Sequence, residues 1–420
     1  MHGGLGRAVG TGGEPMSGPA TDVFAPATLG PITLRNRVIK AATFEARSPA
    51  GAVTDDLIAY HRAPAAGGVG MTTVAYCAVA PEGRTARDQI VMRPDIVPDL
   101  TRLTDAIHAE GAKVCAQLGH AGPVANAASN GVAAISPSRM FSPLAMRATR
   151  RPHSAALSRV VADHARAAEV AVEAGFDGVE LHFAHNYLVS AFLSPLLNRR
   201  RDDYGGSLVN RARLARRIAI AVREAVGDRV AVIAKLSMDD GVAGGLRLEE
   251  SLQVGRWLQD DGALDALELT VGSSLLNPMF YFRGDAPRSE FARTFQPPLS
   301  WALSTAGRPF LRRYPYQDAY LLDHARQFRR ELSMPLILLG GITTKATMDM
   351  AMREGFEFVA MARALLRDPS LLNRIRQDRD AASLCTHCNK CMVTIFERTH
   401  CVLTTEPVTL PDREFIGGSS

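Results

Sequence analysis

Eight short apolar runs, separated by stretches with helical periodicity, constrain the fold of this chain more than any other feature. Each run has the length of one strand and lacks polar alternation, which is typical of strands buried on both faces of a parallel sheet. The runs span residues 38–42, 69–75, 112–118, 178–182, 230–236, 266–271, 335–339 and 356–362. Eight alternating strand and helix signals predict an α/β fold, a closed (β/α)8 or TIM barrel, rather than a doubly wound sheet.

The segments between the runs support this prediction. Before the stop signal Gly175, apolar residues recur at helical spacing: Leu157, Val160, Val161, Ala165, Ala168 and Val172. Two connections, 122–155 after the third strand and 272–317 after the sixth, exceed the usual length. We expect these long loops to shape a pocket at the C-terminal face of the barrel, although they could also form a cap that only packs on it.

Composition and charge exclude several classes of protein. The chain has 48 Lys or Arg and 43 Asp or Glu residues, well interspersed, so we expect a mixed solvated surface and no nucleic-acid partner. The longest apolar runs are strand-sized, which predicts no membrane span. The N-terminus lacks a secretory pattern and the six cysteines suggest no disulfide framework, so we expect a cytoplasmic protein.

A chain of 420 residues can hold two domains or one elaborated barrel. Residues 1–20 are rich in Gly, Ala and Pro, and we predict that they are disordered. We expect the barrel to span residues 21–382, and an extension with four cysteines and a tail to span residues 383–420.

The segment 182–187, with the sequence HFAHNY, lies at the end of the fourth predicted strand. Barrels place their chemistry at this end of the strands. Two imidazoles, His182 and His185, can hold one oxygen of a substrate, and the phenol of Tyr187 can supply a proton. Histidines that are merely satisfied on a structural loop are the other interpretation.

Other strand ends carry polar groups as well. Gln117 offers an amide donor and acceptor to a heterocycle, and Lys235 offers a cation to a negatively charged ring. Gly340 and Gly341 follow the seventh strand and Arg363 follows the eighth, where barrels commonly bind phosphate. Together these positions suggest a phosphorylated planar cofactor.

The motifs resemble the Old Yellow Enzyme family of FMN-dependent NADH:flavin oxidoreductases, or ene-reductases, over roughly residues 22–400. Matching stretches occur in the order of the family, at residues 34–38, 67–70, 81–84, 117–122, 174–187, 192–195, 203–207 and the two phosphate-site segments. The resemblance implies FMN as the cofactor, NADH or NADPH as the reductant, and as substrate a small molecule whose alkene is conjugated to a carbonyl or nitro group. Family members are often oligomers, so we expect a homo-oligomer.

The resemblance also implies residue roles. His182 and His185 match the pair that hydrogen-bonds the activating oxygen of the substrate, and Tyr187 matches the proton donor. The positions expected to bind the cofactor are Ala41, Ala42, Thr43, Tyr76, Gln117, Lys235, Gly340, Gly341, Ala362 and Arg363.

Four positions depart from the family pattern. Lys235 stands where most members have Arg, and Tyr76 stands where a small residue is usual. Phe44 replaces a hydroxyl or thiol residue near the flavin carbonyl, although Thr43 next to it could donate instead. Pro123 replaces a frequent Arg. These changes bear on flavin potential and substrate range.

Four cysteines near the C-terminus, Cys385, Cys388, Cys391 and Cys401, have the spacing C-x2-C-x2-C-x9-C. This spacing resembles the iron–sulfur site of the dienoyl-CoA reductase branch, although that branch has longer gaps and extra nucleotide-binding domains. A [4Fe–4S] cluster, a zinc ion held with His387 or His400, and metal-free thiols all remain open.

Three rival functions also remain open. The same flavin site could serve an oxidative demethylase or dehydrogenase. A non-redox barrel could use His182 and His185 as acid–base groups on a phosphorylated substrate. The chain could also be a metal-stabilised binding protein whose flavin site is vestigial.

Overall fold

The computed structural model describes residues 21–142 and 147–404. Eight parallel strands form a closed barrel in the order β10-β11-β12-β3-β4-β5-β8-β9. Every predicted apolar run overlaps one of them, so the predicted barrel is confirmed. The strands are β3 (Val38–Lys40), β4 (Met71–Ala78), β5 (Lys113–Gly119), β8 (Gly178–Phe183), β9 (Ala231–Ser237), β10 (Ala266–Thr270), β11 (Leu336–Leu339) and β12 (Phe358–Met361).

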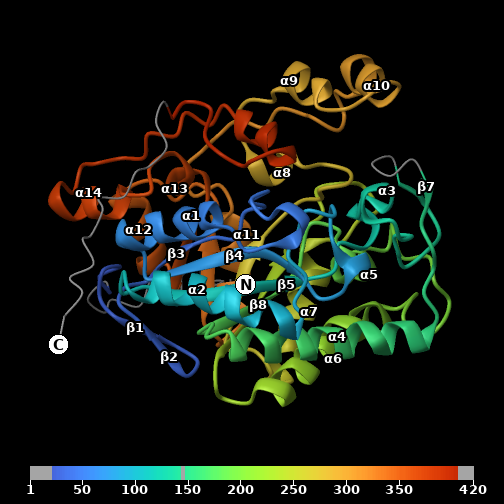
Figure 1. Cartoon of the computed structure of the whole chain (residues 1–420), viewed down its shortest axis with the longest axis horizontal. Coiled ribbons are helices and arrows are strands. Elements are labelled where there is room, and N and C mark those ends of the chain that lie inside the picture. Colours follow the sequence, from blue (N-terminus) through green and yellow to red (C-terminus); the bar gives the residue numbers. More distant parts are fainter. Residues whose placement is uncertain (1–20, 143–146, 405–420) are drawn as a thin grey trace, which may run out of the picture.

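Helices surround the barrel in an outer layer (Figure 1). The outward side chains of the strands and the apolar faces of the helices form one continuous buried core, as expected for this fold. The main helices are α1 (Asp55–Ala66), α2 (Val97–His108), α4 (Ser154–Glu173), α6 (Leu208–Val226), α7 (Leu248–Asp260), α11 (Leu322–Glu331), α12 (Lys345–Arg353), α13 (Arg363–Arg367) and α14 (Leu371–Gln377). None of the helices in the described residues is long and apolar enough to cross a membrane.

A short antiparallel hairpin, β1 (Ala27–Leu29) and β2 (Ile32–Leu34), closes the N-terminal end of the barrel. Its Leu29 and Leu34 are fully buried and pack with the inward side chains Ile233 and Phe358. This hairpin was not predicted from the sequence, because two three-residue strands carry little periodicity.

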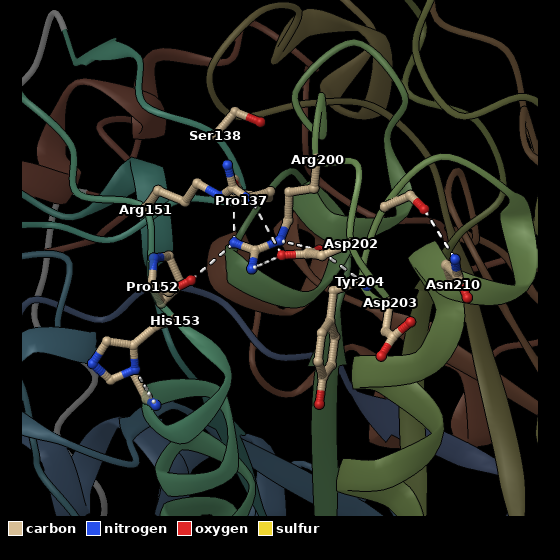
Figure 2. Close-up of polar contacts among 12 residues, drawn as sticks. Pro137, Ser138, Arg151, Pro152, His153, Arg200, Asp202, Asp203, Tyr204 and Asn210 are labelled. Carbon is tan, nitrogen blue, oxygen red and sulfur yellow. Dashed lines mark hydrogen bonds and ion pairs between the residues drawn. The ribbon is translucent and has the colours of Figure 1, made fainter.

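The long connection after β5 holds α3 (Ala127–Asn130) and the strand pair β6 (Phe141–Ser142) and β7 (Arg147–Ala148). Figure 2 shows how Arg200 fixes this loop. Its buried guanidinium forms two hydrogen bonds to Asp202, of 2.9 and 2.6 Å, and donates to the carbonyls of Pro137 at 3.2 Å and Pro152 at 2.9 Å. The loop is therefore held against the segment that precedes α6.

The long connection after β10 forms a cap with three helices, α8 (Met279–Phe282), α9 (Arg288–Arg293) and α10 (Leu299–Ala306). In Figure 1, α9 and α10 stand away from the barrel, on the side where the red C-terminal segment lies. That segment contains two 3-10 turns, η5 (Lys390–Met392) and η6 (Thr394–Phe396). A small apolar core of Met279, Phe291, Leu311 and Met392 joins the cap to it.

Candidate active site

Polar side chains line the inside of the barrel near its C-terminal end. Side chains alternate along a strand, so the outward Leu181 and Leu236 imply that their neighbours His182 and Lys235 point inward. Strand register then places Gln117 beside Glu180, and Glu268 beside Lys235. All of these side chains are at least 95% buried, so the barrel interior carries charge and hydrogen-bonding groups below its rim.

The structure brings the predicted His/His/Tyr group together. The ring centroids of His182 and His185 lie 5.2 Å apart, and those of His182 and Tyr187 lie 4.4 Å apart. The Nδ1 atom of His182 is buried and has no hydrogen-bond partner among the described residues. One imidazole nitrogen is therefore free for a ligand.

Burial controls the protonation of these groups. It lowers the pKa of His185 to about 3, with a smaller contribution from Lys235. Burial, the neighbouring His185 and Lys235 also hold the pKa of His182 well below its ordinary value. Burial raises the pKa of Tyr187. At neutral pH the site therefore presents two uncharged imidazoles and one protonated phenol.

A tight turn aims the second histidine. His185 and Asn186 both have positive φ, 61° and 57°, so the chain reverses direction at the end of β8. The His185 backbone N–H donates to the Ser237 hydroxyl at 3.0 Å, and its Nε2 lies 3.1 Å from the Thr270 hydroxyl. Asn186 donates to Asp240 at 3.1 Å. The last residues of β9 and β10, with Asp240 just after β9, thus fix the turn before α5 (Leu188–Leu193) begins.

Two further tyrosines form walls of this site. The ring of Tyr76 lies 5.4 Å from that of Tyr187, and its hydroxyl donates to the Gly83 carbonyl. The ring of Tyr281, from the cap, lies 4.6 Å from that of His185. Segment 272–317 was expected to shape the pocket, but Tyr281 was not assigned to the site, because only the fold brings α8 over β8.

Lys235 is enclosed by two carboxylates that the sequence analysis missed. Its Nζ lies 3.2 Å from Glu180 and 2.8 Å from Glu268, and Gln117 donates to Glu180 at 2.5 Å. Burial lowers the pKa of Lys235, but the two carboxylates outweigh burial and leave it raised. Burial raises the pKa of Glu268 to about 8, although Lys235 opposes this shift. An acidic residue inside an apolar strand run was the signal available in the sequence.

The predicted phosphate-site residues lie at the ends of β11 and β12. Gly340 and Gly341 have φ of 96° and 76°, and the segment before α11 packs closely on them. A Cβ on Gly341 would lie 2.6 Å from the Ala319 nitrogen, so this close approach requires glycine. Arg363 begins α13 directly after Ala362, and its guanidinium donates to the Arg283 carbonyl at 3.0 Å and to Asn389.

The segment Ala41, Ala42 and Thr43 follows β3 at the same end of the barrel. Ala41 is buried, and its backbone N–H donates to Met361 in β12 at 2.9 Å. The Thr43 hydroxyl lies 2.9 Å from the Tyr60 hydroxyl and 3.2 Å from the Lys40 ammonium. This hydroxyl already has partners, so its role toward a flavin stays a prediction.

Four thiols lie around one cavity in the C-terminal segment. The cavity is lined by Arg363 and by Cys385, Cys388, Cys391 and Cys401. Within the described residues, no group of three or more His, Cys, Asp or Glu side chains is arranged to hold a metal ion. All six cysteines are free, and Cys77 and Cys115 are buried as expected. An iron–sulfur cluster, a zinc ion and metal-free thiols therefore all stay open as alternatives.

Comparison with known proteins identifies the family. A family model described as the NADH:flavin oxidoreductase / NADH oxidase family matches residues 22–269. The chain belongs to this family, so it is an NAD(P)H-dependent flavin oxidoreductase with FMN as its cofactor.

Two curated relatives within reach of sequence comparison are reductases. A 4,4'-dithiodibutanoate disulfide reductase of Rhodococcus erythropolis is 53% identical over 385 residues, which cover 92% of this chain and 96% of the relative. A metal reductase of Desulforamulus reducens is 32% identical over 89% of this chain, which spans only 52% of that longer protein.

Solved structures share the fold. An old yellow enzyme homologue from Zymomonas mobilis superposes with a TM-score of 0.69 at 21% identity, covering 88% of this chain and 96% of that chain. A 2-naphthoyl-CoA reductase gives a TM-score of 0.77 at 24% identity, covering 90% of this chain and 56% of that chain.

The residues at the rim fit FMN. The inward amide at Gln117 and the glycine pair with Arg363 supply groups for an isoalloxazine ring and a phosphate. The two carboxylates beside Lys235 leave less of its positive charge for the ring than expected from a lone cation. The individual residue assignments remain predictions.

Proposed function

We propose that this chain reduces electron-poor alkenes, most simply α,β-unsaturated carbonyl compounds, with NAD(P)H as the source of electrons. The observation that supports this proposal is the pairing of two uncharged, adjacent imidazoles with a protonated phenol at the end of β8. Such a group binds a carbonyl oxygen and holds a proton without carrying charge into the pocket.

FMN, when bound, supplies the hydride for the acceptor carbon. His182 and His185 donate hydrogen bonds to the carbonyl oxygen, and these bonds strengthen as negative charge develops on that oxygen. Tyr187 acts as general acid and protonates the neighbouring carbon. The walls formed by Tyr76 and Tyr281 exclude water and limit the size of the acceptor.

The test is anaerobic turnover of an enone with NADH or NADPH, with the two half-reactions followed separately. The variant Tyr187→Phe should slow the oxidative half-reaction by roughly 10²–10⁴-fold and leave flavin reduction nearly unchanged. Tyr281→Phe is a matched control, because it removes a phenol from the same pocket that is not assigned the proton. An oxidative half-reaction unaffected by Tyr187→Phe would refute the assignment.

A second candidate acceptor is an organic disulfide. The 53% identity to a 4,4'-dithiodibutanoate disulfide reductase, over almost the whole of both chains, favours it. In this reaction the disulfide takes up a hydride and a proton, the S–S bond breaks, and two thiols form. Parallel assays with an enone and with 4,4'-dithiodibutanoate, counting released thiols, distinguish the two acceptors.

The same assays address the rival functions. Turnover of an amine without NAD(P)H would indicate the dehydrogenase or demethylase alternative. The non-redox alternative does not fit the family, whose cofactor is FMN. A cytoplasmic location and a homo-oligomer also stay predictions; cell fractionation would test the location, and size measurement in solution would test the oligomeric state.

A further inference from the structure

Asn389 occupies an unusual place in the C-terminal segment. It lies between Cys388 and Lys390, has a positive φ of 58°, and is 1% exposed. A buried amide must find partners for both of its ends. Its Nδ2 donates to the carbonyls of Arg283 at 3.1 Å and Asp285 at 2.8 Å, and its Oδ1 accepts from Arg363.

The backbone around Asn389 is seated on the cap. The Asp285 backbone N–H donates to the His387 carbonyl at 3.0 Å. A Cβ on Gly284 would overlap that same carbonyl, so the two segments could not approach so closely with any other residue there. Lys390 lies 3.3 Å from Glu290 of α9. The segment that carries the four cysteines, residues 385–401 (the cysteine segment), therefore meets the cap in one interface, and the Asn389 side chain lies inside it.

Arg363 receives its orientation from this interface. The Nη1 atom donates to Arg283 at 3.0 Å and to Asn389, and the guanidinium lies 5.9 Å from the centre of the Phe282 ring. A long side chain loses much conformational freedom when it is held in one geometry. Partners that fix it before a ligand arrives remove that cost from the binding step.

We propose that Asn389 is a positioning residue of the cofactor site. Asn389 holds Arg363 in place and so makes the cysteine segment part of the FMN phosphate-binding site. The inference rests on the assignment of Arg363 to the phosphate. Asn389 directly follows Cys388, which lines the cavity, in the sequence. A rearrangement of the cysteine segment therefore moves the Asn389 side chain and, through Arg363, changes FMN affinity.

The test is the FMN affinity of FMN-free protein, measured by quenching of flavin fluorescence, in a double-mutant cycle of Asn389→Ala and Arg363→Ala. Asn389→Ala removes a hydrogen bond to the charged Arg363, and this loss should raise the Kd of FMN by roughly ten-fold. In the Arg363→Ala background the same substitution should change the Kd by less than about two-fold. An equal loss in both backgrounds, or no loss at all, would overturn the proposal.

Two further variants keep the result interpretable. Asn389→Asp preserves the size of the side chain but places a carboxylate against Arg363, where it competes with the phosphate, so FMN binding should again weaken. Asn198→Ala removes a comparably buried amide, which donates to the carbonyls of Phe192 and Tyr204 at 2.7 Å each, in the segment before α6. It should leave the FMN Kd unchanged, and a similar loss there would attribute the effect to general destabilisation and overturn the proposal.

Failure of this inference and failure of the proposed function are separate. FMN binding is measured without any acceptor, so an enzyme that reduces no enone can still support the role of Asn389. If Arg363→Ala itself leaves FMN binding intact, Arg363 does not hold the phosphate and the role of Asn389 falls with it, whatever the acceptor.

Discussion

Removal of the Lys235 ammonium should destabilise the protein in a strongly pH-dependent way. The ammonium lies between Glu180 and Glu268, and both carboxylates are fully buried. In Lys235→Met, these two acidic groups lose the cation between them. Glu268 already holds a proton below about pH 8 in the natural chain, so it is Glu180 that must either remain charged away from water or take up a proton that the unfolded chain would not hold.

The magnitude follows from the cost of that proton. Protonating an ordinary Glu costs about 1.4 kcal/mol for each pH unit above its usual pKa of about 4.3. One additional proton therefore costs about 5 kcal/mol at pH 8 and about 1.6 kcal/mol at pH 5.5. The larger value agrees with the roughly 3–5 kcal/mol expected when one partner of a buried ion pair is removed.

The sign follows from the direction of the shift. In the variant, the folded-state pKa of a buried carboxyl is raised above its unfolded value. The folded protein then holds a proton that the unfolded chain releases, so stability falls as pH rises above the unfolded pKa. The deficit of Lys235→Met relative to the natural chain should therefore be small near pH 5.5 and large near pH 8.

Urea unfolding of FMN-free protein, followed by circular dichroism at both pH values, measures this deficit. Lys235→Arg keeps the charge and should cost much less. Lys113→Met is the exposed control, because Lys113 pairs with Asp177 at 2.7 Å with 38% of its side chain exposed, and should cost less than about 1 kcal/mol. A deficit below about 1 kcal/mol at pH 8, or one of equal size at both pH values, would refute the reasoning.

Three other outcomes are expected. Burial holds the pKa of His185 to about 3 and lowers that of His182, so the KM of a neutral enone should be flat between about pH 6 and pH 8, and steady-state kinetics over this range would reveal any titration. Arg200→Met should cost about 2–3 kcal/mol and speed proteolysis within segment 120–153, whereas Arg151→Met, which breaks a half-exposed pair to the same Asp202, should cost less than about 1 kcal/mol by urea unfolding. Anaerobically purified protein should contain about four irons per chain if the shared cavity holds a cluster, and elemental analysis that finds neither iron nor zinc would leave four free thiols.

Much of the fold was readable from local sequence. The strand at 178–182 was predicted from an apolar run after the stop signal Gly175, and the structure has β8 at Gly178–Phe183. Position relative to that strand end was enough to bring His182, His185 and Tyr187 into one group, because the three lie within six residues. The prediction of disorder for residues 1–20 lies outside the described residues.

Contacts between distant segments were not readable in this way. The pairing of Lys235 with Glu180 spans 55 residues of sequence. In the sequence, Glu180 and Glu268 are single charged residues within apolar runs, with no indication that they face Lys235. The cap residue Tyr281 meets His185 only because α8 folds over β8. In each case the sequence contained the residue but no signal of its partner.

The sequence alone determined the barrel and the residues at the ends of its strands, because both depend on strand-length apolar runs and on the helical period of 3.6 residues, which a short window contains. Only the tertiary structure decided the electrostatics of the interior and the contact of Asn389 with Arg363. Those features depend on which strands become neighbours and on how burial and neighbouring charges act on each group, and these are properties of the closed barrel as a whole.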